Sequence, residues 1–475
     1  MAARPNILFV LADQMRGDCL GLLGHPALET PHLDAVARRG VVFTAAFSPC
    51  PSCIGARASI MTGLAPSTHG RLGYQDQVPW RYPDMLPEVL ARAGYQTHCV
   101  GKTHFYPQGA RFGFEGLESY EATQNFDRGY VNDYFEWLRE KTGGKVKETD
   151  HGLSYNSWMS RPSHLPEEIH NNTWVAERGI EFLRRRDRTR PFFLNLSFHR
   201  PHAPLDPPQA WWDRYRDRPV APVPVGDWAA ENSVPVTDRD AWRGRLPAEA
   251  LAQSRRAYWA QIAHIDGQIG RCLAALKELD SGPTFILFAS DHGEMLGDHN
   301  LFRKCYAYQG SALVPLVICP PGGAEQPGRS AAPAVLQDLY PTLLEVAGAP
   351  VPSRTEGRSL LPLVAGASEL PGREFVHGEH SDGYAPGTGM QFLTDGREKY
   401  VWLTRSGQEQ LFDLAADPQE LRDLAGDARA RPRLALWRRR MVEVLASRPQ
   451  DGLSDGRRLL AGRSLPDVRP ELLAD

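Results

Sequence analysis

The sequence contains no apolar run of the length that a membrane span needs. A short apolar segment at residues 6–12 follows the first five residues. It is too short for the core and the cleavage site of a signal peptide, and a buried strand explains it better. We therefore predict neither a membrane segment nor a secretory leader.

Cysteine is sparse, with seven residues among 475. Basic residues do not outnumber acidic ones. The odd number and wide spacing of the cysteines exclude a dense disulfide scaffold and favour a reducing, cytoplasmic compartment. Cys50 and Cys53 have C-x-x-C spacing, but a single such pair is weak evidence for zinc. The 54 Lys and Arg residues against 57 Asp and Glu residues give a net charge of −3, so nucleic acid is not an expected partner.

Apolar runs alternate with helical patterns over about the first 370 residues, and then the pattern changes. This alternation predicts an α/β fold whose large, mostly parallel sheet is sandwiched by helices. The later residues predict a smaller antiparallel sheet with one helix, so we expect two domains, 1–371 and 372–475. The strands are expected at 6–12, 41–47, 95–100, 192–198, 284–290, 314–319, 374–377, 390–393, 400–403 and 410–414. The helices are expected at 31–40, 53–61, 86–93, 248–279, 335–347 and 433–446.

Polar residues follow several of these predicted strands directly. Asp13, His104, His202 and Asp291 each come just after a strand end, and the prolines at 201 and 204 predict that the chain leaves regular structure there. Ligands bind at the carboxyl ends of parallel strands, so we expect one shared site. Residues 130–170 and 203–245 have weak periodicity and are predicted to be surface insertions that shape substrate access.

The segment S-C-I-G-A-R-A-S-I-M-T-G, residues 52–63, holds the most reactive candidate, Cys53. On a helix that begins at Cys53, Arg57 lies one turn further on the same face. The alternative to a reactive role is that Cys53 is an ordinary buried cysteine at the start of a helix. The segment resembles the signature of the sulfatase family, in which the cysteine is oxidised to formylglycine. Gly55 stands where that family usually has proline.

Two further segments resemble the metal-binding segments of sulfatases. The first is the apolar strand that ends in Asp13-Gln14, where many members have two aspartates. The second is the strand that ends in Asp291-His292-Gly, followed by Lys304. The resemblance implies that Asp13, Gln14, Asp291, His292 and the modified Cys53 bind one divalent cation, most often calcium, with magnesium or manganese as alternatives. It also implies that Lys304 contacts the sulfate and the leaving group.

The remaining two motifs resemble sulfate-binding segments of the same family. Lys102-Thr-His104 matches a Lys-x-His pair that supplies a cation and a base at the nucleophile. His202, in R-P-H-A-P, matches the histidine that contacts the sulfate. The resemblances cover residues 5–424 in the order of the family.

The resemblance implies hydrolysis of an organic sulfate monoester, with a formylglycine-generating enzyme as the maturation partner. A phosphonate monoester or phosphodiester hydrolase of the same alkaline phosphatase superfamily is the alternative, and Lys102 and His104 favour the sulfatase. A silent binding homologue is a third hypothesis, because Gly55 departs from the signature read by the modifying enzyme. The sequence identifies neither the sulfate ester nor the oligomeric state. We expect substrate identity to depend on the two insertions, His377, His380 and the small domain.

Overall fold

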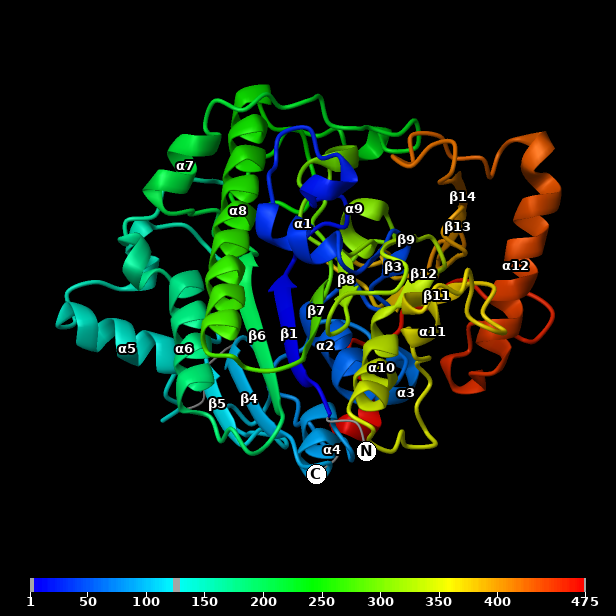
Figure 1. Ribbon diagram of the computed structural model, residues 1–475. Coiled ribbons are helices and arrows are strands. Elements are labelled where there is room, and N and C mark those ends of the chain that lie inside the picture. The colour runs from blue at the N-terminus through cyan, green and yellow to red at the C-terminus, as the bar shows by residue number, and fades with distance from the viewer. Residues whose placement is uncertain (1–3, 123–128, 474–475) are drawn as a thin grey trace.

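The structure is a computed structural model, and it describes residues 4–122 and 129–473. A sheet of eight strands crosses its centre (Figure 1). These strands are β1 (Asn6–Asp13), β2 (Val41–Phe43), β4 (Gln96–Gly101), β5 (Gly116–Ser119), β6 (Phe192–Pro201), β7 (Thr284–Ser290), β8 (Leu316–Cys319) and β9 (Gly328–Ser330). They lie in the order β5-β4-β6-β1-β7-β8-β2-β9, and only β8 runs antiparallel to its neighbours. The predicted large, mostly parallel sheet is therefore confirmed.

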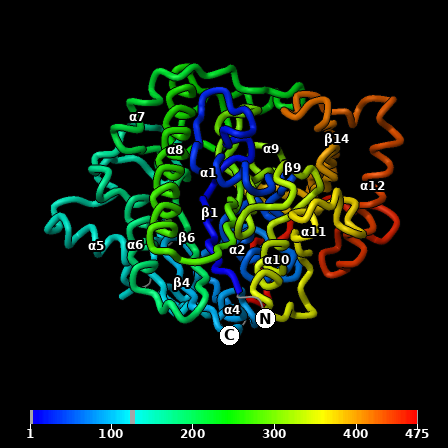
Figure 2. Tube along the Cα trace, viewed as in Figure 1, coloured from blue at the N-terminus to red at the C-terminus, as the bar shows by residue number. Residues whose placement is uncertain are grey.

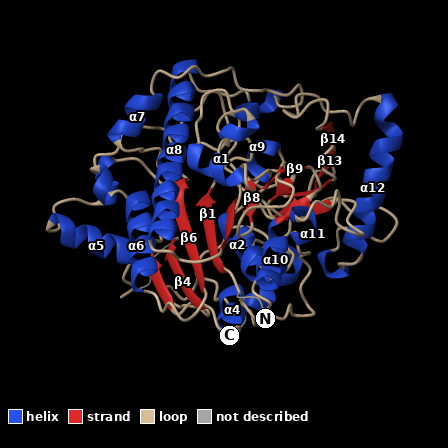
Figure 3. Ribbon diagram, viewed as in Figure 1, coloured by secondary structure: helices blue, strands red, loops and turns tan. Residues whose placement is uncertain are grey.

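Helices cover both faces of this sheet (Figure 3). One face carries α1 (Pro31–Ala37), α6 (Asn171–Arg185) and α8 (Ala248–Glu278), and the other carries α2 (Cys53–Thr62), α4 (Leu86–Arg92) and α10 (Leu339–Val346). In β1, Leu8 and Val10 pack with the first layer, whereas Ile7 and Phe9 pack with the second. Since alternate side chains of a strand face opposite sides, a central strand with two covered faces must be apolar throughout.

The other helices are short or peripheral, namely α3 (Pro66–His69), α5 (Asp133–Thr142), α7 (Gln209–Tyr215), α9 (Gln309–Ala312) and α11 (Leu361–Val364). Within residues 4–122 and 129–473, no helix has both the length and the apolar character required to cross a bilayer. All seven cysteines are buried and free of disulfides.

A second, antiparallel sheet follows in the C-terminal part of the chain. Its strands, β11 (Val376–His380), β12 (Met390–Thr394), β13 (Glu398–Leu403) and β14 (Glu409–Asp413), pair in chain order, and α12 (Arg431–Ala446) packs against β12 and β13. After α12, the C-terminal tail returns to the segment that follows α3, and its trace can be followed in Figure 2. There, Leu72 N–H donates to the Asp467 carbonyl at 2.8 Å, and Arg71 forms a bridge with Val468. The sheet itself matches the prediction, and the domain boundary at residue 371 stays a prediction.

Three local predictions were wrong. Residues 41–47 form two strands, because β3 (Ala46–Phe47) leaves the large sheet to pair with β10 (Ala334–Val335), which also delays the start of α10. β6 continues through Pro201 because its pairing with β4 has already ended at Ser197, so the missing proline N–H interrupts no ladder on that side.

Candidate active site

Four neighbouring parallel strands bring their last residues to one edge of the large sheet. β1 ends at Asp13, while Lys102, His202 and Asp291 come just after β4, β6 and β7. The carboxyl ends of parallel strands meet at the same edge, and the polar side chains from these four ends do lie together.

Cys53 reaches the same place from α2, whose first residue it is. Its Sγ lies 3.1 Å from Nε2 of His292, 3.7 Å from Oδ1 of Asp13 and 3.8 Å from Nζ of Lys102. The amino-terminal end of α2 carries the positive end of the helix dipole, which favours an anion beside Cys53. The predicted helix is thus present, and its first residue sits in a polar cluster.

Arg57 lies one turn further along α2 and is fully enclosed. Its Nε is 2.9 Å from Oδ2 of Asp291, its Nη2 is 3.6 Å from Oδ2 of Asp13, and its Nη1 donates to the Lys102 carbonyl at 2.6 Å. Burial opposes its charge, but the two carboxylates outweigh burial and raise the pKa of Arg57. The guanidinium therefore spans and orients two carboxylates.

The donor atoms of Asp13, Cys53, Asp291 and His292 all lie within 4.8 Å of one another. His292 donates from Nδ1 to the Gly293 carbonyl at 2.9 Å, which directs Nε2 to the cluster. Burial opposes protonation of His292, yet the charges of Asp291 and Cys53 raise its pKa to about 9. The cluster thus attracts positive charge. Two carboxylates and an imidazole fit a divalent cation of the calcium, magnesium or manganese type.

Gln14 lies beside this cluster and turns the chain with a left-handed φ of 68°. Its Oε1 accepts a hydrogen bond from Nζ of Lys304 at 2.8 Å, and its Nε2 donates to Glu294. Its backbone N–H donates to Oδ1 of Asp291 at 3.1 Å. The side-chain oxygen is therefore directed at Lys304, and its predicted role as a metal ligand stays a prediction.

Lys102 lies next to the thiol, with its Nζ 3.8 Å from Sγ of Cys53, and His104 follows two residues later. Nζ of Lys102 forms an ion pair with Asp13. Burial opposes ionisation of Asp13, but Lys102, His202 and Arg57 outweigh burial and hold the pKa of this carboxyl well below its usual range. His104 is buried as well, and burial together with Lys102 and Arg57 lowers its pKa far below the usual value. His104 is accordingly a neutral imidazole that can accept a proton.

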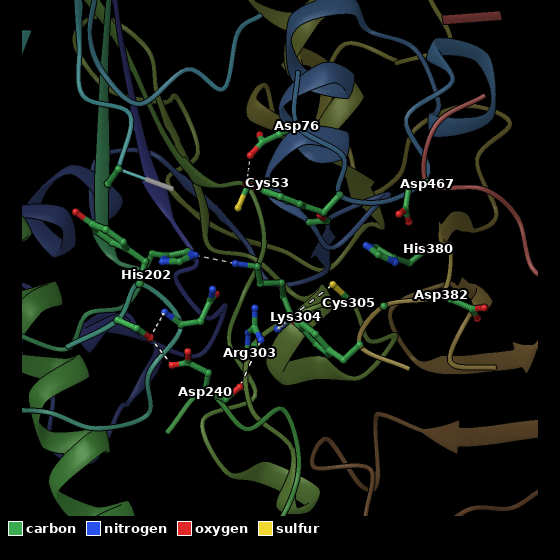
Figure 4. A pocket seen from close by; sticks show the side chains of 18 residues that line it. Cys53, Asp76, His202, Asp240, Arg303, Lys304, Cys305, His380, Asp382 and Asp467 are labelled. Carbon is green, nitrogen blue, oxygen red and sulfur yellow. Dashed lines mark hydrogen bonds between the residues drawn. The ribbon is translucent and has the colours of Figure 1, made fainter. Parts of the chain in front are cut away.

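His202 and Lys304 meet directly. Nζ of Lys304 lies 2.7 Å from Nε2 of His202, and Nδ1 of His202 donates to the Ala203 carbonyl at 2.9 Å. Burial first, and then the charge of Lys304, lower the pKa of His202. His202 is therefore neutral and accepts a hydrogen bond from the ammonium group of Lys304 (Figure 4).

A cavity of about 550 Å³ opens over Cys53, His202 and Lys304 (Figure 4). Both insertions reach it, through Tyr155 and Asp240. Its wall also contains polar residues that the motifs did not indicate, namely Asp76, Asp240, Arg303, Asp382 and Asp467. Arg303 adjoins Lys304 in the sequence, which was the only local signal for any of them. His380, which the sequence analysis did single out, lines the cavity from the small sheet.

Comparison with known proteins finds two matching family models. Residues 5–349 match the family described as Sulfatase, and residues 297–446 match the one described as N-sulphoglucosamine sulphohydrolase, C-terminal. An arylsulfatase of Clostridium perfringens is 40% identical over 97% of this chain and 98% of its own length. A choline-sulfatase of Rhizobium meliloti is 32% identical over 90% of this chain and 83% of its own length.

A solved structure has the same architecture. The phosphonate monoester hydrolase of Agrobacterium radiobacter superposes with a TM-score of 0.78 at 27% identity, over 97% of this chain and 100% of that one. The chain therefore aligns with its relatives over both the large sheet and the small C-terminal sheet.

Proposed function

Because the chain belongs to the sulfatase family and is a sulfuric ester hydrolase, we propose that it cleaves a sulfate monoester with a formylglycine made from Cys53. The placement of Cys53 carries this proposal. Its sulfur lies at a helix N-terminus, 3.1–3.8 Å from an imidazole, a carboxylate and an ammonium group. A nucleophile that attacks a sulfate anion needs such fixed positive charge around it.

Asp13, Asp291, His292 and residue 53 would hold the divalent cation, with the oxygen of Gln14 as an additional donor. Calcium, magnesium and manganese all accept such a donor set, which is rich in oxygen. When bound, the cation supplies positive charge that polarises the sulfate oxygens and the attacking hydroxyl.

In the first step, a hydrated aldehyde at residue 53 would supply the hydroxyl that attacks sulfur as the bond between sulfur and the ester oxygen breaks. Asp291 accepts the proton of the attacking hydroxyl. The Lys304–His202 pair, joined at 2.7 Å, supplies a proton to the departing alcohol. Lys102, which is 3.8 Å from Sγ of Cys53, stabilises the charge on the sulfate oxygens.

In the second step, His104 takes the proton of the remaining hydroxyl. Loss of this proton would let the aldehyde form again while the bond between its carbon and the sulfate oxygen breaks and sulfate leaves. The low pKa of His104 keeps the imidazole neutral and ready for this proton. Arg57 acts indirectly in both steps, because it fixes the carboxylates of Asp13 and Asp291.

The departure from the signature at Gly55 has a packing cause. A Cβ at position 55 would lie 2.5 Å from Sγ of Cys50 and 3.1 Å from the Arg71 carbonyl. The side chain of Cys50 therefore occupies the space that a proline would need.

The alternative is a phosphonate monoester hydrolase, which the similarity to the Agrobacterium radiobacter structure favours. Lys102 and His104 favour the sulfatase, because phosphonate monoester hydrolases, as the resemblance runs, lack this Lys-x-His pair. We expect Lys102→Ala to lower kcat/KM for an aryl sulfate more than for a phosphonate monoester. The reverse ranking would support the alternative.

The test uses the protein co-expressed with a formylglycine-generating enzyme. Mass spectrometry of the peptide that holds Cys53 should show formylglycine, and the protein should hydrolyse an aryl sulfate. Cys53→Ala should abolish turnover, while Cys319→Ala, a cysteine loss far from the cluster, should keep it. An unmodified Cys53 in a protein without activity would support a silent binding homologue, and full activity of Cys53→Ala would exclude the proposed nucleophile.

A further inference from the structure

A second thiol lies in the wall of the catalytic cavity. Cys305 follows Lys304 and borders the same cavity as Cys53 (Figure 4). On its other side it borders a smaller cavity of about 140 Å³, which Trp242 and Tyr306 also line. Cys305 thus has open space on two sides, although only 6% of its surface is exposed.

His380, the last residue of β11, borders the catalytic cavity next to this thiol (Figure 4). It is 2% exposed, and its Nδ1 donates to the Ser381 carbonyl at 2.8 Å. Its Nε2 makes no hydrogen bond of normal geometry within the described part of the chain. A buried imidazole nitrogen therefore remains available beside the sulfur of Cys305.

The surroundings favour a charged pair. Burial opposes the charge on both groups, but the thiolate of Cys305 raises the pKa of His380, and the imidazolium of His380 lowers the pKa of Cys305 to about 7. The hydroxyl of Tyr384 lies 3.7 Å from the sulfur. Thiolates beside a positive histidine are the form of cysteine that reacts with electrophiles.

The backbone fixes the thiol in this place. Cys305 has a left-handed φ of 77°, and its N–H donates to the Pro51 carbonyl at 2.9 Å. Strained backbone of this kind persists only where the surrounding structure holds it. Two of the other cysteines, Cys99 and Cys272, lie in apolar clusters and border none of the cavities described above.

We propose that Cys305, activated by His380, is a modification site in the wall of the substrate cavity, where reaction with small electrophiles, peroxides among them, lowers activity. With iodoacetamide, the sulfur bonds to carbon and iodide leaves. With hydrogen peroxide, the sulfur bonds to one oxygen and the O–O bond breaks. The thiolate is oxidised to a sulfenic acid, and the proton of the His380 imidazolium converts the departing hydroxide to water.

The test labels the folded, mature enzyme with iodoacetamide and follows each cysteine by peptide mass spectrometry. We expect Cys305 to react about tenfold faster than Cys99 and Cys272, and aryl sulfatase activity to fall in step with its labelling. Because the label is read by mass, the result does not depend on the proposed function. Labelling of Cys305 only as fast as Cys99 would overturn the proposal.

Two variants separate the roles of the pair. Cys305→Ala should keep its own starting activity under the same treatment, and equal inactivation of this variant would overturn the proposal. His380→Gln retains a polar side chain but no imidazolium, so the labelling of Cys305 should slow by several-fold. An unchanged labelling rate in His380→Gln would exclude activation by His380. Hydrogen peroxide, with a sulfenic acid probe as the readout, should give the same ranking.

Discussion

Two of the buried charge clusters in the described part of the chain are built differently. Behind the small sheet, Arg448 donates to both carboxylate oxygens of Glu379 at 3.0 and 2.6 Å and to Asp451 at 2.7 Å. In the catalytic cluster, by contrast, Oδ2 of Asp13 and Nη2 of Arg57 make ion pairs without hydrogen-bond geometry.

The difference indicates what each cluster is for. Buried charges are stable when every donor and acceptor finds a partner, so the Arg448 network is complete without a ligand. The catalytic cluster has positive and negative groups in excess of their mutual hydrogen bonds, and Cys53, which belongs to it, borders a cavity. Under the proposed function, a cation and an anionic substrate would complete it.

Among the changes that compare the two clusters, replacement of Arg57 should cause the largest loss of activity. In Arg57→Gln, Asp13 and Asp291 lose the group that orients them, so kcat/KM for an aryl sulfate should fall by about 10²–10³-fold. Steady-state kinetics measures this loss. Added calcium should also recover part of the stability that the variant loses, because a cation replaces the missing charge. A variant with normal kinetics would show that Arg57 does not orient these carboxylates.

Removal of Arg448 is the matched change in the other cluster. Arg448→Gln leaves Glu379 buried without its cation, so the free energy of unfolding should fall by about 3–5 kcal/mol. Urea unfolding followed by circular dichroism measures this change. Calcium should not restore it, since no carboxylate of this network faces the catalytic cavity. Calcium rescue equal to that of Arg57→Gln would contradict the distinction between the two clusters.

Calcium should stabilise the wild-type protein, by less free energy than the loss of Arg448 removes. A ligand that binds only the folded state at 100 times its Kd stabilises it by about 2.7 kcal/mol. The midpoint of thermal unfolding should rise with calcium and fall with a chelator. Asp291→Asn should lose this response, whereas Glu420→Gln, which alters a buried ion pair with Lys399 in the small sheet, should keep it. An equal response in both variants would place the cation elsewhere.

The sequence predicted the catalytic cluster better than the cavity above it. Asp13 and Asp291 were predictable because an apolar strand that ends in a carboxylate is a local pattern, and parallel strands share an edge. The orientation of Arg57 across two carboxylates was not, because it depends on how α2 approaches the sheet.

The residues of the cavity wall could not be predicted from the sequence for the same reason. Asp467 and Asp382 reach the cavity only because the C-terminal tail and the small sheet pack against the large one, and no local periodicity encodes that contact. The split of residues 41–47 is also tertiary in origin, since β3 pairs with a strand almost 300 positions away. Short-range sequence patterns thus predicted the strand ends, whereas the residues of the cavity wall can be identified only from the complete fold.

The dependence of stability on acidic pH is expected to show the smallest effect, and it tests the Arg448 network alone. Burial alone would raise the pKa of Glu379, but Arg448 outweighs burial and lowers this pKa from 4.5 to about 2. A carboxyl whose pKa is lower in the folded state stabilises the protein above the unfolded value. That stability is lost as the pH falls from about 4.5 towards 2. Glu379→Gln cannot titrate, so between these pH values its unfolding free energy should fall less steeply than that of the wild type, by at most about 1.4 kcal/mol per pH unit. Urea unfolding of both proteins at several pH values measures the two slopes. Parallel slopes would mean that Arg448 does not hold Glu379 as an ion. They would contradict the view that the Arg448 network is complete without a ligand.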